Sequence, residues 1–264
     1  MKNKGWIIAM IIFWIILIIF LIAFLSYVIL NNTNIPIGIY NTSNNSEIIC
    51  NENYDLEFIN NIEILVSAGK LKIEENTDDK KVKVLVYGDQ NRQIDVSVDN
   101  GKLKIDNTKS KRVVFSFNNH IDEITVYLPR NYNKEINVKS DYGNVDMIDL
   151  ENATINIEES CGDINLGKVK NLQIDSDYGS IDVDTVLNKL DIEIDCGDLK
   201  IKNIELKENS KIKNDLGDVK IGNTNDIYID ANVDLGEYKI NKNNRYAEST
   251  LKIDVNCGDI KVEN

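Results

Sequence analysis

The chain has few of the residues on which catalytic and metal-binding proteins commonly depend. Its 264 residues include one histidine, two prolines and two tryptophans, and aromatic residues make up only 7%. The single histidine, His120, excludes sites with several histidine ligands and leaves one possible base for a histidine-dependent triad. Because His120 follows Asn118 and Asn119 in a polar run, we expect it to be a loop residue.

Motifs of known chemistry are missing as well. No Gly-x-Ser-x-Gly elbow occurs for a nucleophilic serine, and no glycine-rich phosphate loop of either usual spacing is present. The sequence therefore supplies no catalytic residue, no cofactor-binding residue and no metal ligand set. We expect a protein that is not an enzyme.

Positive charge is scarce after the first few residues. Only Lys2 and Lys4 of the 30 basic residues precede residue 31, whereas all 43 acidic residues follow it, so the remainder of the chain carries a net charge of −15. A domain this acidic repels nucleic acid and anionic lipid, and we expect no nucleic-acid partner.

One long apolar run stands apart from the rest. From residue 6 to residue 30 no side chain is charged, and a helix of that length reaches about 37 Å, enough to cross a hydrocarbon core of about 30 Å. We therefore predict a transmembrane helix over 6–30. A cleaved signal peptide is the alternative, but it ends in small residues, whereas this run ends in bulky ones: Phe24, Leu25, Tyr27, Val28 and Leu30.

The charges around this run predict its orientation. Lys2 and Lys4 lie before it, and residues 31–50 contain no lysine or arginine. By the positive-inside rule, residues 1–5 form a cytoplasmic tail and the chain beyond the helix is extracytoplasmic, so we expect a single-pass protein of the cell membrane. Residues 31–53 predict a flexible stalk, and residues 54–264 an exported β-repeat domain.

Apolar and polar residues begin to alternate shortly after residue 54. The segments 62–64, 71–73, 82–84, 94–96 and 103–105 predict half-buried strands. From residue 136 the alternation becomes a repeat of strand, glycine and strand. The structural repeat glycines are 17 to 22 residues apart: Gly143, Gly162, Gly179, Gly197, Gly217, Gly236 and Gly258.

A constant repeat of this length is typical of stacked units that cannot bury their apolar faces alone. We predict an all-β fold, a parallel β-solenoid with about 19 residues per rung, preceded by the one transmembrane α-helix. An antiparallel meander or sandwich is the alternative, and the near-constant repeat length favours the solenoid. Leu172 and Ile174 share one parity while Ile181 and Val183 take the other, so Gly179 marks a corner with positive φ.

The residue before each repeat glycine is either large and apolar or a cysteine. We expect this position to face inward, with large and small side chains packing on one another and the cysteines acting as small hydrophobes. Cys161 and Cys196 are two rungs apart and Cys196 and Cys257 three, too far for disulfides. The residues concerned are Tyr142, Cys161, Tyr178, Cys196, Leu216, Leu235 and Cys257.

Acidic residues recur with the same period and raise the question of calcium. Stacked carboxylates could hold Ca²⁺, but the Gly-Gly-x-Gly-x-Asp nonapeptide of calcium-binding β-rolls does not occur, so we expect solvated turns and no metal. Interspersed lysines predict charge pairing between rungs. The two acidic columns are Asp163, Asp198, Asp218 and Asp259, and Asp141, Asp177, Asp195, Asp215 and Asp234.

Two stretches resemble a known family. Residues 124–129 read Ile-Thr-Val-Tyr-Leu-Pro, and residues 136–145, which end in Tyr-Gly-Asn-Val, are followed by Gly-Asp-Ile/Val copies. This resembles the bacterial proteins with the domain of unknown function DUF4097, whose members often carry an adhesin label, over roughly 54–264. The resemblance implies a β-repeat domain at the bacterial envelope, frequently behind a membrane anchor, with no established reaction or catalytic residues.

These features predict a membrane-anchored, non-enzymatic cell-envelope protein. Its β-repeat domain is expected to act as a surface binding, adhesin-like or scaffolding module for an envelope protein or a glycan. One alternative is a sensor or regulator in an envelope-stress pathway, whose signal would pass through the helix because the cytoplasmic tail is so short. A polysaccharide-cleaving β-helix enzyme is disfavoured, because its carboxylates need a groove of long loops and the loops between these repeats are short.

Overall fold

A computed structural model describes residue 17 and residues 47–88, 94–108 and 123–263. The chain divides into two units, Met1–Ser43 and Asn44–Asn264. The predicted transmembrane helix over 6–30 lies outside the described residues except for Leu17, and His120 also lies outside them. Within the described part of the chain, no helix combines the length and the apolar character needed to cross a membrane.

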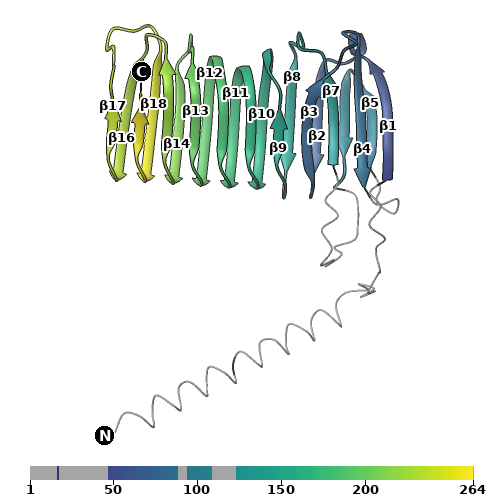
Figure 1. Ribbon diagram of the computed structural model, residues 1–264, viewed down its shortest axis with the longest axis horizontal. Coiled ribbons are helices and arrows are strands. Elements are labelled where there is room, and N and C mark those ends of the chain that lie inside the picture. Colours follow the sequence, from purple (N-terminus) through teal and green to yellow (C-terminus); the bar gives the residue numbers. More distant parts are fainter. Residues whose placement is uncertain (1–16, 18–46, 89–93, 109–122, 264) are drawn as a thin grey trace, which may run out of the picture. The chain divides into compact units, whose positions relative to one another are not determined.

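The described residues of the second unit lie mostly in strands (Figure 1). Its first strand begins at Glu47, and the strands expected from alternation between residues 62 and 105 are confirmed. One short 3-10 helix, η1, covers Leu56–Phe58. The strands are β1 Glu47–Asp55, β2 Asn61–Val66, β3 Lys70–Glu75, β4 Lys81–Gly88, β5 Asp95–Asp99, β6 Lys102–Asp106, β7 Glu123–Leu128, β8 Glu135–Ser140, β9 Val145–Met147, β10 Leu150–Cys161, β11 Ile164–Tyr178, β12 Ile181–Cys196, β13 Leu199–Ile204, β14 Ser210–Leu216, β15 Val219–Thr224, β16 Tyr228–Leu235, β17 Tyr238–Ile240, β18 Thr250–Cys257 and β19 Ile260–Val262.

Each repeat forms one rung of two strand segments that lie on opposite faces of the stack. In β11, residues 171–176 pair in parallel with β10 on one face, and residues 164–166 pair in parallel with β9 on the other. β12 pairs with β11 in the same way on both faces. The parallel pairing predicted for the repeats is confirmed, and the long strands β11 and β12 run without interruption around the corner opposite the glycines.

The end of the stack that holds β1 to β7 departs from the parallel arrangement. β4 pairs antiparallel with β1 and β7, and β5 pairs antiparallel with β6. The two-residue turn between β5 and β6 has positive φ at Asn100 and Gly101, and such a turn can join only antiparallel neighbours. The prediction of a purely parallel domain is therefore wrong at this end.

The rungs at both ends do not follow sequence order. β2 lies between β6 and β8, although β6 comes later in the chain than β2. At the other end β18 lies between β14 and β16, as Figure 1 shows. In the same rungs β19 lies between β15 and β17. The last residues of the chain thus form the second rung from this end, and residues 228–240 form the terminal rung.

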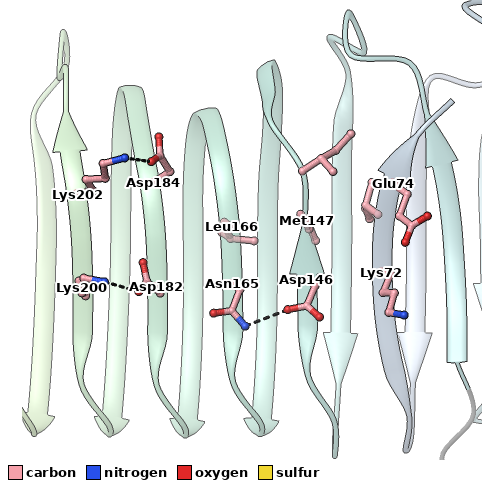
Figure 2. A pocket seen from close by; sticks show the side chains of 12 residues that line it. Lys72, Glu74, Asp146, Met147, Asn165, Leu166, Asp182, Asp184, Lys200 and Lys202 are labelled. Carbon is pink, nitrogen blue, oxygen red and sulfur yellow. Dashed lines mark hydrogen bonds and ion pairs between the residues drawn. The ribbon is translucent and has the colours of Figure 1, made fainter. Parts of the chain in front are cut away.

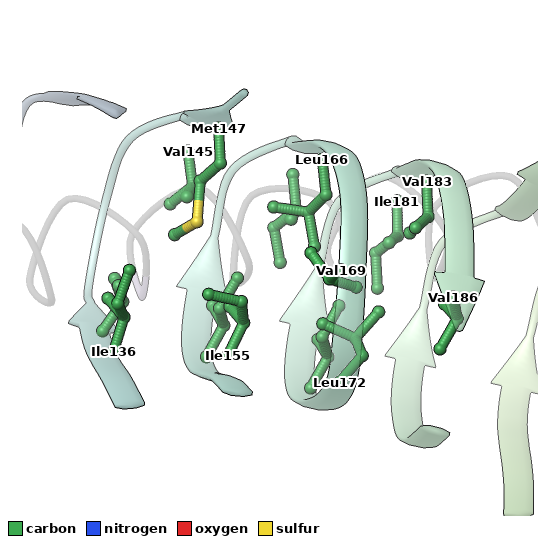
Figure 3. Close-up of a cluster of buried hydrophobic side chains, with 14 of the residues drawn as sticks. Ile136, Val145, Met147, Ile155, Leu166, Val169, Leu172, Ile181, Val183 and Val186 are labelled. Atoms are coloured by element: carbon green, nitrogen blue, oxygen red, sulfur yellow. The ribbon is translucent and has the colours of Figure 1, made fainter. Parts of the chain in front are cut away.

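The core is a narrow apolar interior between the two faces. Equivalent side chains of successive rungs stack in columns, such as Ile136 on Ile155 on one face (Figure 3). On the other face Ile164 stacks on Ile181. These four side chains are 1% exposed or less. Fully burying a side chain of this size contributes about 1.5 to 3 kcal/mol, so the columns stabilise the stack together with the backbone pairing between rungs.

Candidate functional site

The repeat glycines form one column along an edge of the stack. A Cβ atom on Gly179 would lie 1.8 Å from the carbonyl oxygen of Gly162, so neighbouring rungs approach too closely there for any side chain. Gly179 has the positive φ that the sequence predicts, +146°, but Gly162 does not, so the close approach is the more general requirement for glycine. In spatial order the column is Gly69, Gly143, Gly162, Gly179, Gly197, Gly217, Gly258 and Gly236.

Gly69 belongs to this column but was not found from the repeat. It precedes the region of regular spacing, since its nearest partner in the column, Gly143, lies more than 70 residues further along the chain. The apolar residues of 62–64 have even numbers and those of 71–73 have odd numbers. This change of parity across Gly69, like the one at Gly179, is the sequence signal that could have identified it as a corner glycine.

The carboxylates that follow the glycines cap neighbouring rungs. Oδ1 of Asp163 accepts a hydrogen bond from the backbone N–H of Ser180 at 3.0 Å, and Oδ1 of Asp198 accepts one from Asp218 at 2.9 Å. Asp259 does the same for the N–H of Glu237. In the part of the chain that the structure describes, no group of three or more His, Cys, Asp or Glu residues could hold a metal ion. The lack of a specific calcium site stays a prediction.

The side chains before the glycines point away from the core. The four large ones are 50% to 70% exposed, and the cysteines are exposed or half-buried. The prediction that this position faces inward is therefore wrong. We call this row the ridge, and in spatial order it consists of Tyr142, Cys161, Tyr178, Cys196, Leu216, Cys257 and Leu235.

The geometry of the corner explains the direction of these side chains. Leu172, Ile174 and Ser176 face the interior, but the interior ends at Ser176. The backbone carbonyl of Tyr178 accepts a hydrogen bond from the N–H of Gly162 at 3.0 Å, within the tightly packed glycine column. Because the backbones of successive rungs touch there, a side chain finds no room between them, and Tyr178 lies on the outside.

Large residues and cysteines alternate strictly along the ridge in space. Tyr178 lies between Cys161 and Cys196, and Leu216 lies between Cys196 and Cys257. In sequence order the alternation breaks, because two leucine rungs precede the last cysteine rung. In space the rung of Cys257 lies between the rungs of Leu216 and Leu235, which restores the alternation. The ridge therefore has a large residue at each end, and we call the position of each smaller cysteine between two large residues a notch.

The placement of the rungs corrects one prediction about the cysteines. Cys161 and Cys196 are two rungs apart as predicted, but Cys196 and Cys257 are also two rungs apart, rather than three. Two rungs correspond to about 9.6 Å at the usual strand spacing, beyond the reach of a disulfide. All four cysteines are free, and burial, with the charge of Glu52, raises the pKa of the Cys50 thiol to about 11.

Carboxylates accompany the ridge on both sides. On one side they occupy the position just before the ridge residue, in Asp141, Asp177, Asp195, Asp215 and Asp234. On the other side they follow the glycine, in Asp163, Asp198, Asp218 and Asp259. The ridge is therefore an apolar line within a strongly negative border.

Several carboxylates gather on the rungs around Tyr178. Burial and the nearby carboxylates of Glu193, Asp177, Glu158 and Asp195 raise the pKa of Asp175. Among the described residues no lysine or arginine forms an ion pair with Asp175, Asp177 or Asp195. A cation placed beside this part of the ridge would find uncompensated negative charge.

A shallow depression lies on the face that carries β3, β9 and β13 (Figure 2). It encloses about 470 Å³ over the short strand β9, with Met147 and Leu166 at its base. Lys200 pairs with Asp182 at 2.8 Å and Lys202 with Asp184 at 2.9 Å, which confirms the predicted charge pairing between rungs. These pairs leave little unmatched charge, so the depression is a weaker candidate than the ridge.

One buried carboxyl group lies beneath the ridge. Glu159 is 3% exposed and stands between Ser140 and Ser176 of the adjacent rungs, and neither of its oxygens makes a hydrogen bond of good geometry with the described residues. Burial raises its pKa to about 7, and the nearby Ser140 hydroxyl and the backbone N–H of Cys161 offset that effect only in part. Glu159 has the same parity as the buried Ile155 and Ile157, so the alternation along this strand is the sequence signal that could have assigned it to the interior.

Comparisons with known proteins agree with this architecture. The profile of the family described as Toastrack DUF4097 matches residues 59–264. No curated protein matches the chain. A proposed adhesin of Bacteroides fragilis has 18% sequence identity and a TM-score of 0.50, with 83% of this chain and 98% of that chain covered. This likeness supports the fold alone.

Two further solved structures are similar at lower scores. A proposed cell-adhesion protein of Clostridium sporogenes has 15% identity and a TM-score of 0.40, with 82% of this chain and 99% of that chain covered. A proposed lipid-binding protein of Parabacteroides distasonis has 17% identity and a TM-score of 0.43, with 84% and 98% covered.

Proposed function

The chain belongs to the Toastrack DUF4097 family, and on that premise we propose that its repeat domain is a non-enzymatic binding module held on the outer side of a membrane by the helix over 6–30. In this role the domain displays the ridge to partners in the cell envelope. The adhesin role proposed for the Bacteroides fragilis relative is of the same kind.

The exposed ridge is the observation that carries this proposal. Four large apolar side chains, Tyr142, Tyr178, Leu216 and Leu235, lie in one line with 50% to 70% of their surface in solvent. Single exposed apolar residues are common, but a contiguous apolar patch with a polar border is typical of an interaction site. The core does not need these side chains, because its columns are complete without them.

A photo-crosslinking experiment tests the binding role. The ridge carries exposed thiols at Cys161 and Cys257, which can be labelled on intact cells with a thiol-reactive photo-crosslinker. We expect light-dependent adducts with an envelope component. The matched control replaces Cys161, Cys196 and Cys257 by serine and carries the label on Tyr246→Cys, an exposed position away from the ridge. Equal adducts from the control, or none from the ridge, would contradict the proposal.

The anchor is tested separately by proteolysis. External protease should remove the β domain from intact cells that express the full chain, because Lys2 and Lys4 keep the N-terminus in the cytoplasm. In the matched variant, Lys2→Asn and Lys4→Asn are combined with Asn31→Lys and Asn32→Lys, which reverses the charge asymmetry and should protect the domain. Protection of the unaltered chain would overturn the assigned orientation.

A further inference from the structure

The notches of the ridge recur at a fixed interval. Cys161, Cys196 and Cys257 each lie between two large residues, and each is two rungs from the next. At the usual spacing between strands, two rungs correspond to about 9.6 Å. A partner that uses all three notches must therefore present a side chain about every 9.6 Å along a straight line.

The conformations available to a peptide differ in how well they meet this interval. A polyproline II helix has three residues per turn and rises about 3.1 Å per residue, so one row of its side chains repeats every 9.3 Å or so. An extended strand repeats on one face after about 6.8 Å, and an α-helix after about 5.4 Å or, over two turns, about 10.8 Å. Only polyproline II keeps register across three notches.

The surroundings of the notches restrict the charge of the partner. The border of the ridge is acidic on both sides, and the carboxylates of Glu193, Asp177, Glu158 and Asp195 lie close enough to Asp175 to add to burial in raising its pKa. A second copy of this chain would bring its own acidic border into contact, and anionic lipid or nucleic acid would be repelled in the same way. Arginine or lysine would be attracted, and arginine can also stack on Tyr178.

We propose that the ridge binds a basic, proline-rich segment of another protein in the polyproline II conformation. One row of apolar side chains occupies the notches at Cys161, Cys196 and Cys257 between the large residues, and cationic side chains meet the carboxylates of the border. Aromatic-lined grooves that receive a preformed, low-entropy polyproline II helix are an established mode of peptide recognition. Here the notches between the large side chains take the place of such a groove. The inference rests on the proposed binding function of the ridge and specifies the kind of partner.

Defined peptides test the spacing and the charge independently. The probe is an end-blocked peptide of five Leu-Pro-Arg repeats, labelled for fluorescence anisotropy and titrated with the full chain in detergent micelles. One control replaces every arginine by glutamate, and a second uses Leu-Pro-Arg-Pro repeats, which keep the charge and conformation but break the three-residue period. We expect the first peptide to bind at least about tenfold more tightly than either control. Equal affinity for the three-residue and four-residue repeats would overturn the proposal, as would no binding of any peptide.

A substitution in the middle notch provides the matched test on the protein. Cys196→Tyr fills the notch with a residue that the neighbouring rung already carries at Tyr178, so the variant should fold normally. It should weaken binding of the Leu-Pro-Arg peptide about tenfold or more, whereas Tyr246→Ser should leave the affinity unchanged. Unaltered affinity of Cys196→Tyr would overturn the proposal. If the ridge crosslinks to an envelope component but these peptides do not bind, only the polyproline II inference is wrong. If neither crosslinking nor peptide binding is observed, the proposed binding function is wrong as well.

Discussion

Oδ1 of Asp218 accepts a hydrogen bond from the backbone N–H of Asp259, 2.9 Å away, although 41 residues separate them in the chain. This contact joins the rung of β14 and β15 to the rung of β18 and β19. The rung of β16 and β17, residues 228–240, packs on the other side of β18 and β19 and ends the stack. The terminal rung at this end therefore depends on residues that follow it in sequence.

Removing the acceptor at Asp218 should loosen this end of the stack. Asp218→Ala leaves the N–H of Asp259 without its partner and should lower the free energy of unfolding by about 1 kcal/mol. We expect faster hydrogen exchange at Asp259 and, because the outer rung packs there, in β16. Asp218→Asn, which retains an acceptor oxygen, is the matched control, and an equal effect of the two changes would argue against the cap.

Substitution in the glycine column should be far more damaging than a change on the outer face. Gly179→Val forces a Cβ against the carbonyl oxygen of Gly162 and a β-branched residue into φ of +146°, so we expect a loss of at least about 3 kcal/mol. Lys213→Ala, which removes exposed ion pairs with Glu193 and Asp215, should cost less than about 1 kcal/mol. Thermal melting compares them, and similar shifts would refute a role for close packing at the corner.

Glu159 should make stability depend on pH. Its pKa is raised from 4.5 to about 7 in the folded state, so its contribution is fully present below pH 4.5 and is lost as the pH rises to about 7. The loss is on the order of 3 kcal/mol. Glu159→Gln should abolish this part of the dependence and unfold at higher denaturant than the unaltered chain at pH 8. Glu158→Gln, on the exposed side of the same strand, is the control and should retain the slope.

The cysteines should differ sharply in reactivity. Cys161 and Cys257 are exposed, whereas Cys50 is 8% exposed and its thiol pKa is raised to about 11, so little of the reactive thiolate exists there at neutral pH. Timed alkylation of the folded chain, followed by peptide mapping, should modify Cys161 and Cys257 well before Cys50. The same maps without reduction should contain no link between Cys161 and Cys196 or between Cys196 and Cys257, and either link would disprove the register.

Much of the architecture could be predicted because it depends on local patterns. Alternation placed Leu172 and Ile174 inside on one side of Gly179 and Ile181 and Val183 inside on the other, as the structure has them. Side chains alternate along every strand whatever its neighbours are, so this information needs no knowledge of the pairing. The acidic residues after the glycines were recognised as a column for the same reason, although their bonds to backbone amides were not.

The amino-acid sequence by itself determined the strands, the glycine corners and the parity of the core, because each depends on residues close together in the chain. Only the tertiary structure decided that β18 lies between β14 and β16, because the backbone N–H and C=O groups on the edge of a strand can pair with many different strands. It also decided that Tyr178 points outward. Alternation correctly gives Tyr178 the parity of Ile174, but only contact between the glycine backbones of successive rungs closes the interior before that position and turns the side chain into solvent.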